Sequence, residues 1–142
     1  MFEIKKSLLI YSKISELDQI HNFVKDLSKN IPLNDNHIYH LTLALEEACV
    51  NIMKHSYHND PTKTISIEAT FKENELTFKI EDNGPSFDPR SIYAVEEKKL
   101  QKNIKKGGWG ILLISRIIDR IDYIPKNQSS PYNQLILTKI LE

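Results

Sequence analysis

The amino-acid sequence predicts an α+β fold of two layers, in which helices cover one face of a mixed, mostly antiparallel sheet. Two observations lead to this prediction. Residues 64–71 and 75–81 read as strands separated by three residues, which is the spacing of a hairpin. Residues 34–57 carry the longest helical pattern of the chain, with apolar side chains along one stripe. Neighbouring strands that pair as hairpins favour an antiparallel sheet with its helices in a separate layer.

The N-terminal part of the chain predicts one strand and two helices. Residues 2–11 alternate between apolar and polar side chains, as a strand with one buried face does. Residues 15–30 have apolar residues at helical spacing, and Ser15 with Asp18 resembles a capping pair. The second predicted helix is the 34–57 segment. Its apolar stripe consists of Ile38, Leu41, Leu45, Ala48 and Ile52.

The C-terminal part predicts a long loop, a helix and two closing strands. Residues 85–106 are polar and weakly periodic, and a stretch of that length inside a small domain is usually functional or mobile. Glycines gather at 107–110, and residues 111–121 then read as a helix that is apolar on nearly all sides. Residues 122–124 and 135–141 read as strands joined by a polar loop.

Composition indicates one domain over residues 1–142. The 142 residues are 40% hydrophobic, which suffices for a single core. The 19 basic and 19 acidic side chains cancel, which argues against nonspecific nucleic-acid binding and against a polybasic membrane anchor. The single cysteine, Cys49, suits a reducing compartment, and no segment resembles a signal peptide or a membrane span. We therefore expect a cytoplasmic protein with no direct nucleic-acid or membrane partner.

A first candidate site lies on the predicted 34–57 helix. Glu47 and Asn51 are four residues apart and share one helix face. A carboxylate accepts a proton or orients a nucleophile, and an amide oxygen is a hard ligand suited to magnesium. A solvated helix face, where Glu and Asn are common, is the alternative for this pair.

A second candidate site follows the predicted 75–81 strand. Asp82 presents a carboxylate at the strand end, where it can accept a hydrogen bond from an exocyclic amine such as that of adenine. Gly84 has no Cβ, so the backbone there can approach a flat ring closely. An ordinary turn explains the same residues equally well.

A third candidate site is the glycine-rich segment 107–110 ahead of the predicted C-terminal helix. Three of the four glycines of the chain lie there, and backbone amides at a helix N-terminus favour an anion. Lysines just before it, including Lys106, can supply charge opposite a phosphate. The alternative is a flexible loop with a solvated lysine run. The segment is not a Walker loop, because no Gly-Lys-Ser/Thr follows.

The ordered trio of candidate sites resembles the GHKL superfamily of ATPases and kinases over nearly the whole chain. Residues 46–55 resemble its N box, residues 82–89 its first glycine box, and residues 107–114 its second. The short chain, the Glu-Ala-x-x-Asn form and the Asp-x-Gly-x-x-Phe-Asp-Pro form are closest to bacterial anti-sigma factor serine kinases of the RsbW and SpoIIAB type.

The resemblance implies a Bergerat-type α/β sandwich that uses ATP and Mg²⁺. It implies that Glu47 is the general base, that Asn51 binds the magnesium, and that Asp82 binds the adenine amine with Gly84 beside the ring. Residues 85–106 would form an ATP lid. The phosphate contacts that the resemblance implies are those of Lys106, Gly108 and Gly110.

The resemblance also implies partners. The substrate would be a serine or threonine on an anti-anti-sigma (STAS-type) protein, the second partner a sigma factor, and the kinase itself a homodimer. The chain departs from the family in two places: Lys105-Lys106 stands where Arg is common, and Tyr132-Asn133-Gln134 stands where Gly-Thr often opens the last strand. The second departure implies that a contact near adenine is lost or replaced.

Three functions follow as hypotheses. The first is an ATP-dependent protein serine/threonine kinase that also acts as an anti-sigma factor. The second is a nucleotide-binding interaction module with weak or no phosphoryl transfer, which the Tyr-Asn-Gln departure motivates. The third is the catalytic half of a histidine kinase, which would need a phospho-accepting histidine; His21 is the one histidine in the helix before the N box, and it lacks the usual acidic neighbour.

Overall fold

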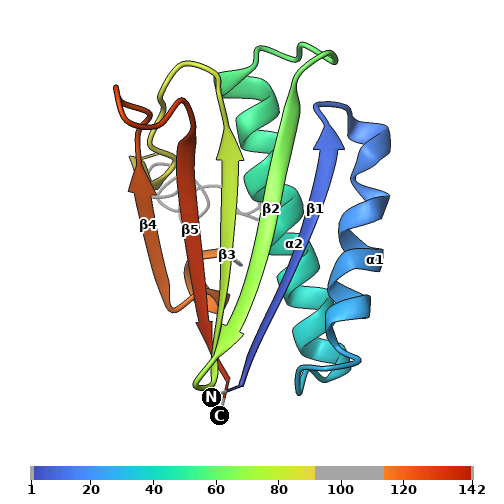
Figure 1. Ribbon diagram of the computed structural model, residues 1–142. Coiled ribbons are helices and arrows are strands. Elements are labelled where there is room, and N and C mark those ends of the chain that lie inside the picture. The colour runs from blue at the N-terminus through green and yellow to red at the C-terminus, as the bar shows by residue number, and fades with distance from the viewer. Residues whose placement is uncertain (1, 92–113, 142) are drawn as a thin grey trace, which may run out of the picture.

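The computed structural model describes residues 2–91 and 114–141. Within them the strands form one sheet in the order β1-β2-β3-β5-β4, and each neighbouring pair is antiparallel (Figure 1). This confirms the predicted fold class. The prediction was a mixed, mostly antiparallel sheet, and in the described residues every strand pair is antiparallel. The strands are β1 (Glu3–Tyr11), β2 (Thr64–Lys72), β3 (Glu75–Asp82), β4 (Arg120–Ile124) and β5 (Asn133–Ile140).

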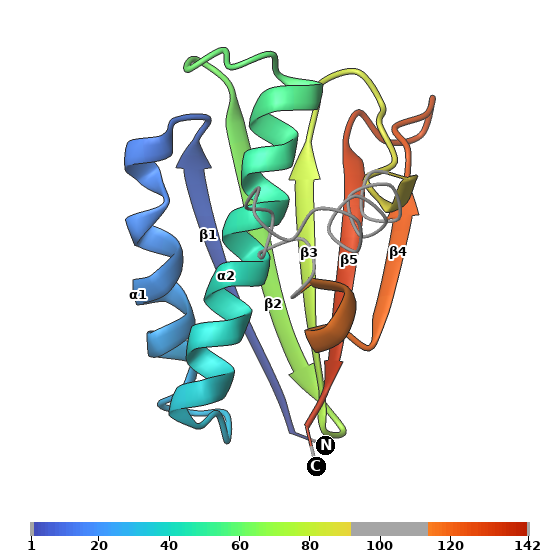
Figure 2. The same cartoon turned by 180° about the vertical axis from the view of Figure 1, so that it is seen from behind.

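The helices lie on one face of the sheet, as Figure 2 shows from behind. They are α1 (Asp18–Leu27) and α2 (Asp35–Asn51), preceded by a 3₁₀ turn, η1 (Ile14–Glu16), and followed by a π-helical turn, η2 (Ile52–Ser56). None of the helices in the described ranges is both long and apolar enough to cross a bilayer.

The two long helices begin differently. Asn34 caps α2: its side chain accepts from the His37 backbone N–H at 2.8 Å, and His37 Nδ1 accepts from the Asn34 backbone N–H at 3.2 Å. The predicted capping pair of Ser15 and Asp18 is wrong. The 3₁₀ turn occupies the residues around Ser15, and α1 starts from Leu17 with no side-chain cap.

The predicted C-terminal helix, 111–121, is wrong at its end. Residues 114–117 are helical, and the last helical hydrogen bond runs from the Ile118 N–H to the Ile114 carbonyl. The Asp119 N–H already bonds the Thr138 carbonyl at 2.9 Å, so pairing with β5 takes over there. A continuous apolar run does not distinguish helix from strand, which is why the sequence pattern overextended the helix.

The core lies between the sheet and the helices. Side chains alternate along β3, so that Leu76, Phe78 and Ile80 are fully buried beneath the helices. Asp82 continues this inward-facing series, which directs a carboxylate toward the helix layer. Cys49 on α2 is also in the core, and burial raises the pKa of its thiol to about 12, which keeps it unreactive.

Candidate functional site

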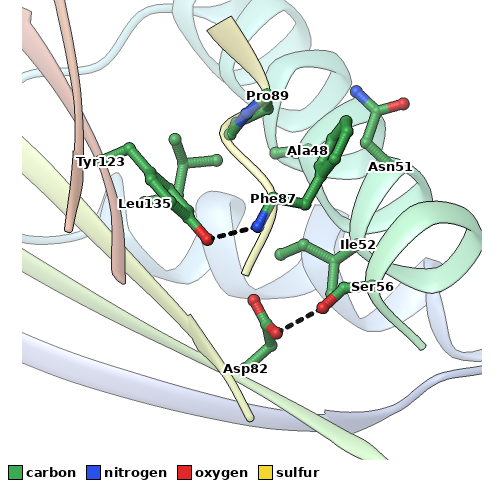
Figure 3. A pocket seen from close by; sticks show the side chains of 9 residues that line it. All are labelled: Ala48, Asn51, Ile52, Ser56, Asp82, Phe87, Pro89, Tyr123 and Leu135. Atoms are coloured by element: carbon green, nitrogen blue, oxygen red, sulfur yellow. Dashed lines mark hydrogen bonds between the residues drawn. The ribbon is translucent and has the colours of Figure 1, made fainter. Parts of the chain in front are cut away.

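A small hollow lies between the C-terminal end of α2 and the end of β3 (Figure 3). Its volume is about 300 Å³, counting the part open to solvent. It brings together Asn51 and Asp82, which the sequence placed in separate candidate sites. The residues that line it are Ala48, Asn51, Ile52, Ser56, Asp82, Phe87, Pro89, Tyr123 and Leu135.

Asp82 is 5% exposed and its two carboxylate oxygens are not equivalent. Oδ1 accepts three hydrogen bonds, from Ser56 Oγ at 2.7 Å, from the Gly84 N–H at 3.0 Å and from Asn133 Nδ2 at 3.0 Å. Among the described residues no donor reaches Oδ2, and Figure 3 shows this oxygen directed away from Ser56, toward the hollow. The carboxylate therefore retains acceptor capacity on the side where a ligand would sit.

Ser56 reaches Asp82 because α2 ends in a π turn. The Tyr57 N–H bonds the Ile52 carbonyl at 2.9 Å, five residues back. This wider winding places residues five apart on one side, so Ser56 faces the same hollow as Asn51. Ser56 was not predicted from the sequence, since a helical periodicity of 3.6 residues gives no sign of a π turn.

Gly84 packs directly against the end of the π turn. A Cβ on Gly84 would lie 2.8 Å from the Ser56 carbonyl oxygen and closer still to Ser56 Oγ. The glycine is therefore required by the close approach of two backbones. Its predicted place beside a flat ring stays a prediction.

Asn133 is the second residue that the sequence analysis did not assign to the site. It is 1% exposed, and its amide makes four hydrogen bonds. Nδ2 donates to Asp82 Oδ1 and to the Gly84 carbonyl at 2.9 Å, and Oδ1 accepts from Ser86 Oγ at 2.7 Å and from the Lys126 N–H at 2.9 Å. The departure from the family at 132–134 was a signal, but it did not point to the Asp82 carboxylate.

Asn51 is 6% exposed and lies on the hollow, one helical turn after Glu47. Its Nδ2 is buried and has no hydrogen-bond partner within the part of the chain that the structure describes. An unsatisfied buried N–H donor is uncommon, and it calls for an acceptor, such as an oxygen of a ligand, rather than for a cation. The amide chemistry fits the expected magnesium, with Asn51 Oδ1 as one protein ligand and water and phosphate as the others.

No group of three or more His, Cys, Asp or Glu residues suited to a metal ion occurs in residues 2–91 and 114–141. A cation at the hollow would therefore depend on an amide and on the ligand's own oxygens, as Mg²⁺ with a nucleotide commonly does.

The adjacent glutamates on α2 have different surroundings. Burial raises the pKa of Glu46, and the negative charge of Asp18 on α1 raises it further, so Glu46 lies on the side of α1. Glu47 is half-buried and is not one of the residues that line the hollow. It precedes Asn51 by one turn on the same face, which agrees with the spacing used to predict the pair.

Phe87 and Pro89 cover the hollow from the segment after β3. The Phe87 ring stacks on His55, with ring centres 5.1 Å apart, and the Phe87 N–H donates to the Tyr123 hydroxyl at 2.8 Å. Burial raises the pKa of that hydroxyl, which stays protonated at neutral pH. The space inside the hollow that a water-sized sphere can enter is only about 10 Å³, far below the roughly 300–1,000 Å³ typical of ligand sites. A nucleoside triphosphate would have to extend beyond the hollow or displace residues 85–91.

The predicted phosphate contacts of Lys106, Gly108 and Gly110 lie outside the described residues, as do residues 92–106 of the predicted lid. Only the first part of that lid, 85–91, is described.

Comparisons with known proteins find relatives of the chain in sequence and in fold. Two curated relatives are both named Serine-protein kinase RsbW. The one from Bacillus thuringiensis is 33% identical over 85 residues, covering 57% of this chain and 52% of that protein. The one from Halalkalibacterium halodurans is 25% identical over 103 residues, covering 70% of this chain and 62% of that protein. The chain thus spans about half the length of the first of these relatives.

Two solved structures share the fold at 11% identity. The structure of the SiaB-SiaC complex from Pseudomonas aeruginosa matches with a TM-score of 0.65, over 96% of this chain and 89% of that one. The structure of the RsbU and RsbW domains of a Mycobacterium tuberculosis protein matches with a TM-score of 0.61, over 98% of this chain and 33% of that one.

The family described as Histidine kinase-like ATPase domain matches residues 10–139, which is most of the chain. This match covers β2, β3 and β4, nearly all of β5, both long helices and every residue that lines the hollow, but only the end of β1. The chain belongs to the histidine kinase-like ATPase domain family.

Proposed function

We propose that the 142 residues form one ATP-binding kinase domain. Its proposed reaction transfers a phosphoryl group to a serine or threonine of an anti-anti-sigma protein. The same domain is proposed to bind a sigma factor and so to act as an anti-sigma factor. The observation that supports the kinase proposal most is the meeting of Asp82 and Asn51 at one hollow, since they are far apart in sequence. One offers a carboxylate oxygen without a donor among the described residues, and the other offers a buried amide.

Each residue then has a stated task. Asp82 Oδ2 accepts a hydrogen bond from the adenine amine, and Asn51 holds the magnesium through its amide oxygen. When bound, ATP would supply the phosphoryl group, and the magnesium held by Asn51 would neutralise the charge on the phosphates. Glu47 accepts the proton of the substrate hydroxyl and orients it. Lys106, Gly108, Gly110 and the 85–106 lid are proposed to surround the phosphates.

The proposed partners rest on the resemblance and on the kinase names of the curated relatives. The homodimer and the cytoplasmic location remain predictions. The alternative is a nucleotide-binding interaction module. Tight ATP binding without transfer to any partner protein would favour that module over the kinase.

Magnesium-dependent ATP binding tests the site directly. We expect Asn51→Ala and Asp82→Asn each to weaken binding about tenfold or more, since each removes one charge-assisted contact. Glu81→Gln is the matched control, because Glu81 is the next residue on β3 and points to the opposite face. Unchanged affinity in both site variants would contradict the proposed site.

Labelled ATP incubated with an anti-anti-sigma protein tests the reaction. We expect phosphoserine or phosphothreonine on the partner, and loss of that label in Glu47→Ala. Full activity in Glu47→Ala would remove Glu47 from its proposed role. Label on His21 of the chain itself would instead support the histidine-kinase alternative; His21 borders a surface depression with Lys25 and Tyr39, and it does not line the hollow.

A further inference from the structure

The hydrogen bonds around Asp82 leave one oxygen occupied and the other available. Three donors from separate parts of the chain converge on Oδ1: the Ser56 hydroxyl from the π turn, the Gly84 N–H from the loop and the Asn133 amide from β5. A carboxylate on a short side chain otherwise rotates broadly about its last torsion. Convergence of three donors on one oxygen holds the carboxylate in one orientation.

The orientation of the Asn133 amide is itself determined by its partners. The Lys126 backbone N–H can only donate, so it requires the amide oxygen, and the Gly84 carbonyl can only accept, so it requires the amide nitrogen. A flipped amide would place donor against donor and acceptor against acceptor. Nδ2 therefore has to face Asp82.

This geometry has a consequence for the base that binds. Adenine offers a single amine on its six-position edge, which one oxygen can accept. Guanine has a carbonyl at that position, and beside it an N–H and an amine that together suit both oxygens of a freely rotating carboxylate. An Asp82 with Oδ1 already occupied cannot make that two-oxygen contact, and its Oδ2 would face the guanine carbonyl.

We propose that Asn133 and Ser56 are positioning residues that set base selectivity: by occupying Oδ1 of Asp82, they present Oδ2 alone to the hollow and so favour adenine over guanine. This inference rests on the proposed function, because it requires a purine nucleotide at Asp82. It assigns a task to two residues that are not themselves expected to touch the reacting phosphate.

The test compares ATP and GTP as competitors of a fluorescent adenine nucleotide in the full chain. We expect the ratio of the GTP to the ATP dissociation constants to fall about tenfold in Asn133→Ala and by a smaller factor in Ser56→Ala. Each variant removes one donor from Oδ1, but the single Ser56 hydroxyl proton also has the Pro85 carbonyl as an acceptor at 3.0 Å, so it holds Oδ1 less firmly. General loosening of the fold would weaken both nucleotides alike and leave this ratio unchanged.

Gln134→Ala is the matched control, because the Gln134 amide bonds the Glu81 carboxylate at 3.0 Å on the neighbouring rung of the same ladder. Its ratio should equal that of the wild type. Ser56→Ala keeps the inference testable if Asn133→Ala does not fold, since it removes one donor from Asp82 and leaves the Asn133 amide in place.

A ratio within about twofold of the wild type in each folded variant would overturn the inference and leave the proposed function intact. A wild-type chain that binds neither nucleotide would overturn the proposed function, and the inference with it.

Discussion

Two neighbouring rungs of the β3–β5 ladder carry the same chemical pair on opposite faces of the sheet. Asp82 lies opposite Asn133 and Glu81 lies opposite Gln134, and in each pair an amide donates to a carboxylate at 3.0 Å. On the helix face the pair is buried and the carboxylate oxygen accepts two more donors. On the open face the pair is half-buried, and no second donor to Glu81 occurs among the described residues.

The comparison shows that an amide–carboxylate hydrogen bond alone does not make a binding site, because burial and the additional donors distinguish the Asp82 pair from the Glu81 pair. A pair near solvent exchanges freely with water and contributes little, whereas a buried pair must satisfy every polar group or lose stability. Substitutions in the open-face pair, in the buried pair and beside the buried pair test that contrast.

The largest effect is expected for the two amides. Asn133→Ala should lower the free energy of unfolding by about 3 kcal/mol, because it leaves the Gly84 carbonyl and the Lys126 N–H without a partner and removes one of the three donors to Asp82. Gln134→Ala should lower it by less than about 0.5 kcal/mol. Urea unfolding followed by circular dichroism measures both, and equal losses would contradict the contrast.

Gly84→Ala should lower the free energy of unfolding by about 2 kcal/mol, since the new methyl group would overlap the end of the π turn at Ser56. Part of this loss should be recovered in the double variant with Ser56→Ala, which removes one of the two overlapping oxygens. A double-mutant cycle in urea gives the coupling. Strictly additive losses would show that the Ser56 hydroxyl is not what excludes a side chain at Gly84, which leaves the Ser56 carbonyl as the obstacle.

The pH dependence of stability above pH 10 tests the contribution of the buried Tyr57 hydroxyl. Burial raises the pKa of its hydroxyl, which donates to the Thr64 carbonyl at 2.6 Å and accepts from the Asn83 N–H at 3.0 Å. The unfolded chain therefore loses this proton first, at about pH 10, and stability contributed by the protonated hydroxyl is lost as pH rises further. We expect the wild type to lose up to about 1 kcal/mol more than Tyr57→Phe between pH 10 and 11, which is the limit for one proton that the folded protein retains. Parallel curves for the two proteins would contradict this.

The smallest effect is expected for Glu81→Gln. The charge lies on the open face, where an exposed ion contributes about 0–1 kcal/mol, so stability should change by less than about 0.5 kcal/mol. Differential scanning calorimetry at neutral pH measures it. A loss as large as that of Asn133→Ala would mean that the open face carries a structural network of its own.

Much of the fold was predictable from residues close together in sequence. The hairpin of β2 and β3, the apolar stripe of α2 and the apolar–polar alternation of β1 each depend on a local period of apolar residues. Such a period can be read from the sequence alone. The end of the helix near Ile118 was not predictable in this way. An apolar run there satisfies either structure, and the partner strand β5 decided between them.

In the candidate site, too, some features follow from local sequence and others from tertiary packing. Residue types and spacing alone determined that Asn51 and Asp82 were candidates, and that one followed a helix pattern and the other a strand. Only the tertiary structure decided which oxygen of Asp82 is available, because its donors come from Ser56, 26 residues away, and from Asn133, 51 residues away. Hydrogen bonds between distant segments depend on how strands and helices pack, and no local period of the sequence records that packing.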